Sequence, residues 1–304
     1  MKKSNTGRLV LLTLFLLFLL CGRASAQDAL PPLPQPLQAT LPLPDMPPIT
    51  HANDTIPVEV FFPLAFRDTG DNRIVDPDGV LQPVLERLRR VRAHFSSDTV
   101  RIVHIGDSHV RGHIYPRQVG TRLVQTFGEV NYTDMGVNGA TCLTFTHPER
   151  IRQIAELKPE LLILSFGTNE SYNRRYDAAA HYRQMDELVT LLREALPGVP
   201  ILLTTPPGSY DRGRRRRGVR TYTINPRVPT AAIAIRRYAA DHQLAVWDLF
   251  DVAGGSRRAC ANWTNARLMR PDHVHFFAEG YVLQGDLLYE ALIKAYNDYV
   301  STLQ

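Results

Sequence analysis

The segment VRIVHIGDSHVRG (residues 100–112) joins an apolar run to a short polar cluster. Residues 100–105 are typical of a buried strand, and Asp107, Ser108 and His109 follow it closely. A serine at this place is commonly the N-cap of the next helix. It can also be a nucleophile presented at the edge of a sheet. The cluster alone does not distinguish these readings, so other parts of the chain must supply the partners that a nucleophile needs.

The N-terminal segment 1–26 has the composition of a secretory signal peptide. Basic residues precede the apolar run 9–20, and the triplet ASA at 24–26 matches a cleavage pattern. A retained membrane anchor is the alternative, but the run is short for a bilayer-spanning helix. We therefore predict export, cleavage after this triplet, and no stable membrane span in the mature protein.

Removal of this segment changes the charge balance. The whole chain has 35 Lys and Arg against 30 Asp and Glu, a net charge of +5. Four of the basic side chains and none of the acidic ones lie in segment 1–26, which leaves 31 basic against 30 acidic side chains. A nearly neutral protein gives no support for binding to nucleic acid or to a membrane surface.

Two cysteines, Cys142 and Cys260, lie outside the predicted signal peptide. Export favours a disulfide between them, and two free thiols are the alternative.

The chain is expected to contain three segments after the signal peptide. Residues 27–54 are rich in Pro and Leu and are predicted to be an extended linker. Residues 55–97 are predicted to be an N-terminal extension that packs on the core, and its part 55–66 could add an edge strand. Residues 98–304 are predicted to form the main domain.

Helical and strand-like patterns alternate from residue 80 onward. The predicted strands are 100–105, 130–134, 161–166, 200–205 and 244–249. The predicted helices are 81–95, 114–127, 151–157, 178–196, 230–242 and 278–299. This alternation predicts a parallel sheet with helices on both faces. Ligands of such sheets bind beyond the carboxyl ends of the strands, and one such end precedes Ser108.

Candidate partners of Ser108 lie at other strand ends and in a C-terminal loop. Gly139 and Asn169 each follow a predicted strand, and their N–H groups could stabilise a developing oxyanion. Asp272 and His275 lie three residues apart before the last predicted helix. One loop could thus supply an imidazole base and the carboxylate that fixes its tautomer.

These motifs occur in the order and spacing of the SGNH (GDSL-type) esterase superfamily, which the chain resembles over residues 98–298. Each motif is weak alone, but four in order are a strong signal. The motifs are GDS at 106–108, glycine at 139, GTN at 167–169 and D-x-x-H at 272–275. The resemblance implies a three-layer α/β/α flavodoxin-like fold with a central parallel sheet. It also implies acyl-ester hydrolysis without a cofactor or metal.

The resemblance implies a role for each residue of the candidate triad. Ser108 would be the nucleophile, His275 the general base, and Asp272 the residue that orients His275. His273 is the alternative base, but the D-x-x-H spacing favours His275.

The resemblance also implies an oxyanion hole. It would consist of the backbone N–H groups of Ser108 and Gly139 and the side-chain amide of Asn169. Asp107 and Gly167 would support the loops that carry these donors.

The motifs IGDSH, SFGTNES, TTPPGSY and LMRPDHVHF resemble most the branch that includes bacterial peptidoglycan O-acetylesterases. Those enzymes remove O-acetyl groups from muramic acid outside the cytoplasmic membrane. The resemblance therefore implies an acetylated glycan or peptidoglycan as substrate, and the periplasm or cell envelope as location. A glycan O-acyltransferase and a non-catalytic glycan-binding module are the alternatives.

Four residues are candidate substrate contacts: His109, Arg214, Arg215 and Trp263. His109 occupies the position where most relatives have Leu or Ile. The two arginines belong to a group of six in residues 212–220, which would be a solvated loop or a rim that binds the carboxylates of an anionic glycan or peptide. Trp263 could stack on a sugar ring, and core packing is the alternative.

Two other histidines have different expected roles. His104 lies inside a predicted strand and is expected to be a hydrogen-bonded core residue. His273 is close to His275, but no further His or Cys lies nearby at ligand spacing, so no metal site is predicted.

Overall fold

The computed structural model describes residues 54–216 and 219–303. The predicted signal peptide (1–26) and all but the last residue of the predicted linker (27–54) lie outside the described residues. No helix in the described part of the chain is both long and apolar enough to cross a membrane.

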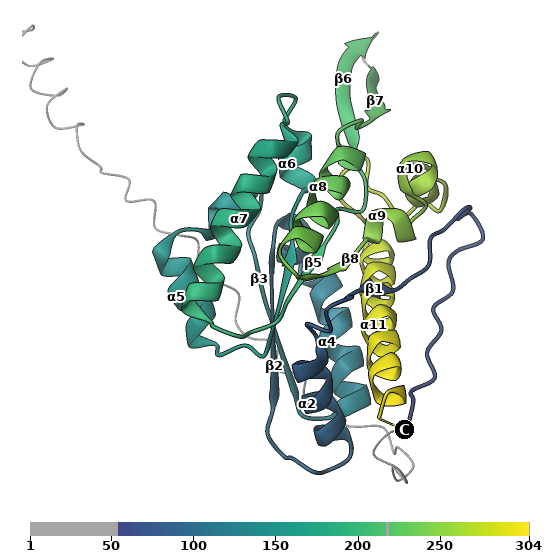
Figure 1. The fold of residues 1–304 in the computed structure, drawn as a ribbon. Coiled ribbons are helices and arrows are strands. Elements are labelled where there is room, and N and C mark those ends of the chain that lie inside the picture. The colour runs from purple at the N-terminus through teal and green to yellow at the C-terminus, as the bar shows by residue number, and fades with distance from the viewer. Residues whose placement is uncertain (1–53, 217–218, 304) are drawn as a thin grey trace, which may run out of the picture. The chain divides into compact units, whose positions relative to one another are not determined.

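The described residues contain a main sheet of six strands in the order β1-β8-β5-β4-β2-β3 (Figure 1). Its strands are β1 (Ile74–Val75), β2 (Val100–Gly106), β3 (Val130–Gly136), β4 (Leu161–Ser165), β5 (Ile201–Thr204) and β8 (Ala245–Trp247). All neighbouring pairs are parallel except β1 with β8. The continuous apolar runs of the sequence are explained by burial of these strands on both faces.

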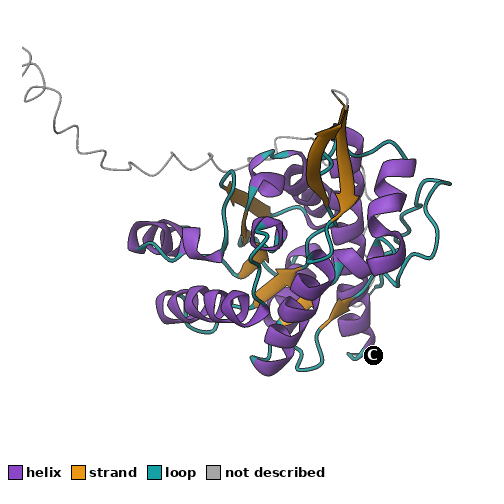
Figure 2. Ribbon diagram, turned by 90° about the horizontal axis from the view of Figure 1, so that it is seen from above, coloured by secondary structure: helices purple, strands orange, loops and turns teal. Residues whose placement is uncertain are grey.

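Helices cover both faces of this sheet, as Figures 1 and 2 show. One face carries α2 (Gln82–Arg92), α4 (Ile114–Phe127) and α11 (Ala278–Ser301). The other face carries α5 (Pro148–Glu156), α7 (Ala178–Ala195) and α8 (Val228–Asp241). The predicted three-layer α/β/α class with a mostly parallel sheet is therefore confirmed.

The predicted edge strand at 55–66 is wrong. This segment is not a strand, and it lies along α11, where the backbone of Ile56 exchanges two hydrogen bonds with the Asn297 side chain. The edge position is filled instead by β1, which pairs antiparallel with Val246 and Trp247 of β8. Prolines at 57 and 63 lack the N–H groups that a regular ladder needs.

The arginine-rich segment forms a hairpin of β6 (Tyr210–Arg216) and β7 (Val219–Ile224), which projects beyond the sheet (Figures 1 and 2). The sequence pattern suggested a loop or rim here and did not predict two paired strands. Two further helices that were not predicted follow β8: α9 (Leu249–Val252) and α10 (Gly255–Asn265).

The favoured disulfide between Cys142 and Cys260 is also wrong, because both are buried free thiols. Cys142 begins the short 3-10 helix η1 (Cys142–Phe145), which packs against α7. Cys260 lies on α10, where its thiol donates to the carbonyl of Ser209. The two residues are thus held in separate surroundings.

Candidate active site

Ser108 is the first residue of α3 (Ser108–Arg111), directly after β2. Asp107 is the N-cap of this helix, and its carboxylate accepts the backbone N–H of His109 at 2.8 Å. A methyl group at Gly136 of β3 would lie 2.1 Å from the backbone nitrogen of Arg111. The nucleophile-bearing turn therefore packs on the neighbouring strand at a distance that only glycine permits.

A chain of hydrogen bonds links Ser108, His275 and Asp272. The Ser108 Oγ lies 2.9 Å from His275 Nε2, and His275 Nδ1 lies 2.9 Å from Asp272 Oδ2. The second carboxylate oxygen of Asp272 accepts the backbone N–H groups of Val274 and His275, both at 2.9 Å. With the proton on Nδ1, Nε2 is free to accept the proton of Ser108.

Asp272 is held in its ionised form. Partial burial alone would raise its pKa, but the backbone N–H groups and the His275 ring donate to the carboxylate, and the net effect is a lowered pKa. A carboxylate that stays ionised can stabilise a positive charge on His275.

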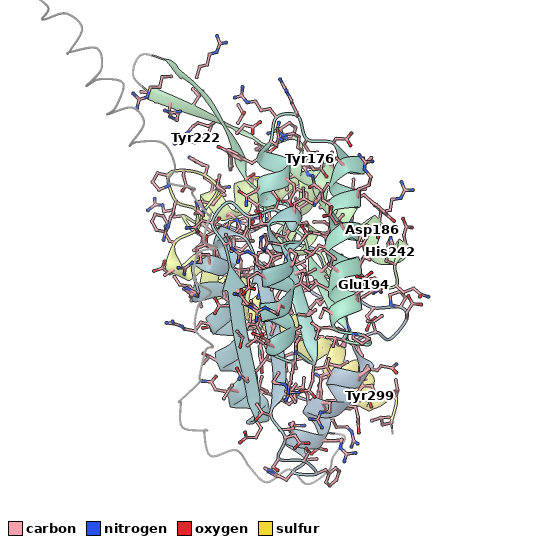
Figure 3. The ribbon with its side chains drawn as sticks, turned by 90° about the vertical axis from the view of Figure 1, so that its left-hand side faces the viewer. Tyr176, Asp186, Glu194, Tyr222, His242 and Tyr299 are labelled. Atoms are coloured by element: carbon pink, nitrogen blue, oxygen red, sulfur yellow. The ribbon has the colours of Figure 1, made fainter. Side chains whose placement is uncertain are left out.

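The alternative base, His273, does not face Ser108. Its ring packs against Tyr222 and Tyr210 of the hairpin, with ring centroids 4.2 and 5.0 Å away. Figure 3 shows Tyr222 on this hairpin. The structure thus brings His275, and not His273, to the serine.

The predicted oxyanion donors surround the same serine. Ser108, Gly139 and Asn169 line one pocket. The Asn169 amide donates to the carbonyl of Ala140 at 2.8 Å and makes a longer contact of 3.4 Å with Asp107. Gly139 has a φ of +73°, a conformation that favours glycine, and the space beside its Cα is open. The pocket therefore leaves open space beside Gly139, next to Ser108 and Asn169.

The pocket at this strand edge has a volume of about 730 Å³. Asp272 and His275 form part of its wall, together with Tyr172 and Tyr281. This space is sufficient for a sugar-sized ligand.

The family model of the GDSL-like lipase/acylhydrolase family matches residues 104–283, more than half of the chain. The chain belongs to this family. It is therefore a carboxylic-ester hydrolase, and the predicted resemblance is confirmed. A comparison with curated protein sequences yields no match.

Several solved structures are similar to this GDSL-family acylhydrolase. A structure described as a peptidoglycan O-acetylesterase in action is 19% identical with a TM-score of 0.65, and the match covers 74% of this chain and 99% of that chain. A GDSL-like lipase from Bacteroides thetaiotaomicron VPI-5482 is 19% identical with a TM-score of 0.46, with coverages of 69% and 98%. A carbohydrate acetylesterase family member from Sinorhizobium meliloti is 19% identical with a TM-score of 0.46, with coverages of 65% and 99%. At these identities, the first of these similarities shows a shared fold.

The four candidate substrate contacts of this acylhydrolase do not line the pocket. Trp263 is fully buried, donates its indole N–H to Pro207, and packs against Phe66 and Phe276, so core packing is its role. His109 is 5% exposed, and its ring bonds to the hydroxyl of Tyr281.

The other two, Arg214 and Arg215, lie farther along the hairpin, and neither reaches the pocket wall. Three different arginines do line it: Arg111, Arg212 and Arg270. Only the position of Arg212 within the arginine run pointed to one of them.

Glu170 is a supporting residue that the motif search missed. This buried carboxylate accepts the backbone N–H of Gly167 through one oxygen and that of Cys142 through the other, both at 2.9 Å. It therefore ties the loop of Asn169 to the segment that follows Gly139. Its place directly after the GTN motif was the available signal.

His104 is a core residue, as expected, with both ring nitrogens bonded, to Tyr132 and Ser165. Burial lowers its pKa to about 3, so it is neutral.

Within the described residues, Cys142, Glu170 and His181 bring three possible metal-ligand atoms within 4.8 Å of one another. Both Glu170 oxygens already accept backbone N–H groups, and burial raises the pKa of the Cys142 thiol well above its usual value. Within this group, Glu170 therefore serves as a hydrogen-bonded support for the loops that carry Gly139 and Asn169.

Proposed function

We propose that this GDSL-family acylhydrolase is an exported serine esterase that removes O-acetyl groups from peptidoglycan or a related cell-envelope glycan. The observation that carries the proposal is the hydrogen-bonded chain of Ser108, His275 and Asp272 at the wall of a sugar-sized pocket. The signal-peptide pattern of segment 1–26 supports an envelope substrate. The fold shared with a peptidoglycan O-acetylesterase is consistent with it.

The proposed reaction begins with attack of Ser108 Oγ on the carbonyl carbon of the acetyl ester. His275 Nε2 takes the serine proton, and the ionised Asp272 stabilises the resulting imidazolium. The carbonyl oxygen becomes an oxyanion, which accepts the N–H groups of Ser108, Gly139 and Asn169. In this step the Asn169 amide would exchange its long 3.4 Å contact with Asp107 for the oxyanion. One such donor contributes about 3–4 kcal/mol to lowering the barrier.

Collapse of this intermediate breaks the bond between the carbonyl carbon and the sugar oxygen, and that oxygen takes a proton from His275 to become a free hydroxyl. An acetyl group then remains on Ser108. His275 then deprotonates a water molecule, which attacks the carbonyl carbon of this acetyl-enzyme and forms a second oxyanion. When this intermediate collapses, acetate leaves and His275 returns the proton to Ser108. The catalyst is regenerated, and the products are a free sugar hydroxyl and acetate.

The test is acetate release from O-acetylated peptidoglycan, compared with the same material after chemical deacetylation. We expect acetate only from the first substrate with the wild-type enzyme, and none with Ser108→Ala. Equal acetate release by Ser108→Ala would contradict the proposal. Transfer of acetyl to an added glycan acceptor, in place of acetate release, would favour an acyltransferase.

A further inference from the structure

Three arginines from separate parts of the sequence meet at the pocket of Ser108. Arg111 ends α3, Arg212 lies on β6, and Arg270 precedes Asp272 in the loop of the proposed base. Asp272 is the only carboxylate among the described residues of the pocket wall. Its two oxygens are already occupied by N–H donors of its own loop. The wall therefore has an excess of positive charge.

These arginines lack acidic partners in the described part of the chain. None of the three lies within 4.0 Å of a carboxylate oxygen there, whereas Arg227 at the foot of the same hairpin pairs with Asp211. Arg111 contacts the ring of His113, and that ring in turn bonds to the buried Asp134. The guanidinium groups of Arg212 and Arg270 make no hydrogen bond within the described residues, so both are available to a ligand.

The base of the hairpin fixes the place of Arg212 relative to the catalytic loop. The backbone N–H of Tyr210 donates to the carbonyl of His273 at 3.0 Å, two residues from His275. Arg174 also donates to the backbone carbonyl of Arg212 itself. The strand carrying Arg212 is thus joined directly to the loop of the proposed base.

The hairpin also separates Arg212 from the arginines that follow it. The pairing register of β6 with β7 shifts between Arg212 and Arg215. Such a shift changes the direction of side chains along a strand. Arg212 lines the pocket, while Arg214 and Arg215 do not. Arg212 is therefore placed to contact a ligand in the pocket, whereas Arg214 and Arg215 are not.

We propose that Arg212 and Arg270, assisted by Arg111, bind a carboxylate carried by the substrate beside the scissile ester. The inference rests on the proposed esterase function and names its substrate class, acyl esters of glycans that carry a free carboxylate, either on a lactyl ether without a stem peptide or on the peptide itself. A planar guanidinium can donate two parallel N–H groups to one carboxylate, which supplies both orientation and affinity. Neutral acetylated sugars lack the group that these arginines bind and are poor substrates.

A matched pair of sugars tests this selectivity. The 6-O-acetyl esters of N-acetylmuramic acid and N-acetylglucosamine share the sugar ring and the ester, and only the first carries a carboxylate, on its lactyl ether. We expect kcat/KM for the anionic ester to exceed that for the neutral one by about tenfold at low ionic strength, with the ratio shrinking as salt is added. Equal values at low ionic strength would overturn the inference.

Paired variants identify the residues responsible. Arg212→Gln/Arg270→Gln should lower the anionic-to-neutral ratio of kcat/KM about fivefold or more. Arg214→Gln/Arg215→Gln removes the same charge from the hairpin outside the pocket and should leave the ratio unchanged. An equal effect of both pairs, or no effect of the first pair, would overturn the inference.

A small probe pair separates this inference from the proposed function. Release of 4-hydroxybenzoate from 4-acetoxybenzoate, and of methyl 4-hydroxybenzoate from its methyl ester, reports the effect of a carboxylate without a sugar. One outcome is that neither sugar ester is cleaved, while Arg212→Gln/Arg270→Gln lowers the anionic-to-neutral ratio of kcat/KM for the aryl esters. In that case the proposed glycan substrate is wrong and the carboxylate site is supported. The other outcome is that both sugar esters are cleaved equally and Arg212→Gln/Arg270→Gln leaves the ratio of kcat/KM for the aryl esters unchanged. In that case the carboxylate site is wrong and the proposed esterase function is supported.

Discussion

Ser108, His275 and Asp272 depend on one another at the level of single atoms. The serine has a base only because His275 Nε2 faces it, and a proton held on Nδ1 by Asp272 would leave Nε2 free to accept the serine proton. Asp272 is held in turn by two backbone N–H groups of its own loop. The proposed chemistry therefore depends on a carboxylate that does not touch the substrate ester.

Asp272→Asn should preserve the shape of the loop and lower kcat for an aryl acetate by about three to four orders of magnitude. An amide cannot accept from the backbone and also stabilise a protonated His275. The circular dichroism spectrum should stay unchanged. A variant with more than a tenth of wild-type kcat would contradict the proposed role.

The pKa of Asp107 is shifted in the opposite direction to that of Asp272. Burial raises its pKa to about 7, although the His109 N–H and the charge of His275 oppose the shift. The folded state thus binds this proton more tightly than the unfolded chain does. Its contribution to stability is largest at low pH and falls as the pH rises from 3.8 to about 7.

Asp107→Asn removes this titration and keeps an oxygen that can accept from His109. Between pH 5 and pH 8, the wild type should lose about 2–3 kcal/mol more unfolding free energy than the variant. Urea unfolding of both proteins at the two pH values measures the difference. Identical losses would show that Asp107 has an ordinary pKa.

At the level of helices and strands, the apolar periodicity of the sequence was sufficient to predict the five parallel strands of the main sheet, but not the edge strand β1. The helix α4 has the predicted bounds, and β2, β3, β4, β5 and β8 lie within one or two residues of their predictions. The hairpin was not predicted because β6 is rich in arginine and no described residue of either strand is buried. The sequence left Trp263 open between sugar stacking and core packing, because α10, which carries it, was not predicted.

That Ser108, Asp272, His275 and the proposed oxyanion donors lie at one pocket was predictable, because each follows a strand or shares one loop. The pocket arginines were not, since no local pattern tells which exposed arginine faces a cleft. The role of Glu170 could not be predicted for a related reason. Its two backbone partners, Gly167 and Cys142, lie in different loops that only the fold brings together.

Glu170→Gln should impair the pairing of these two loops, because an amide supplies one acceptor oxygen and leaves one backbone N–H without a partner. We expect kcat to fall about tenfold with KM nearly unchanged, as the oxyanion donors lose their positions. The unfolding free energy should fall by about 1–3 kcal/mol. Glu170→Asp, which keeps both oxygens, should recover part of kcat; loss of stability alone, with wild-type kcat, would indicate a purely structural role.

Across the described chain, stability comes from two apolar layers and not from a covalent crosslink. The two buried clusters lie on opposite faces of the main sheet. Cys142 and Cys260 contribute as small buried side chains, and burial raises the pKa of Cys260 to about 11. A thiol in this state reacts slowly with external reagents.

The chain without segment 1–26 should therefore contain two thiols that react with Ellman's reagent after denaturation without reductant. In the folded protein, almost none should react. Thermal unfolding should occur at the same temperature with and without reductant. Absence of thiols in the denatured, unreduced protein would reveal a disulfide.

The chemistry proposed for the whole molecule requires its fold to activate one serine, Ser108. Covalent labelling with a fluorophosphonate, followed by intact mass and peptide mapping, tests it most directly, because such reagents need an activated serine. We predict a single adduct on Ser108, no adduct in Ser108→Ala, and labelling at least about 100-fold slower in His275→Ala. An adduct on another residue, or labelling of His275→Ala at the wild-type rate, would contradict the roles assigned to Ser108 and His275.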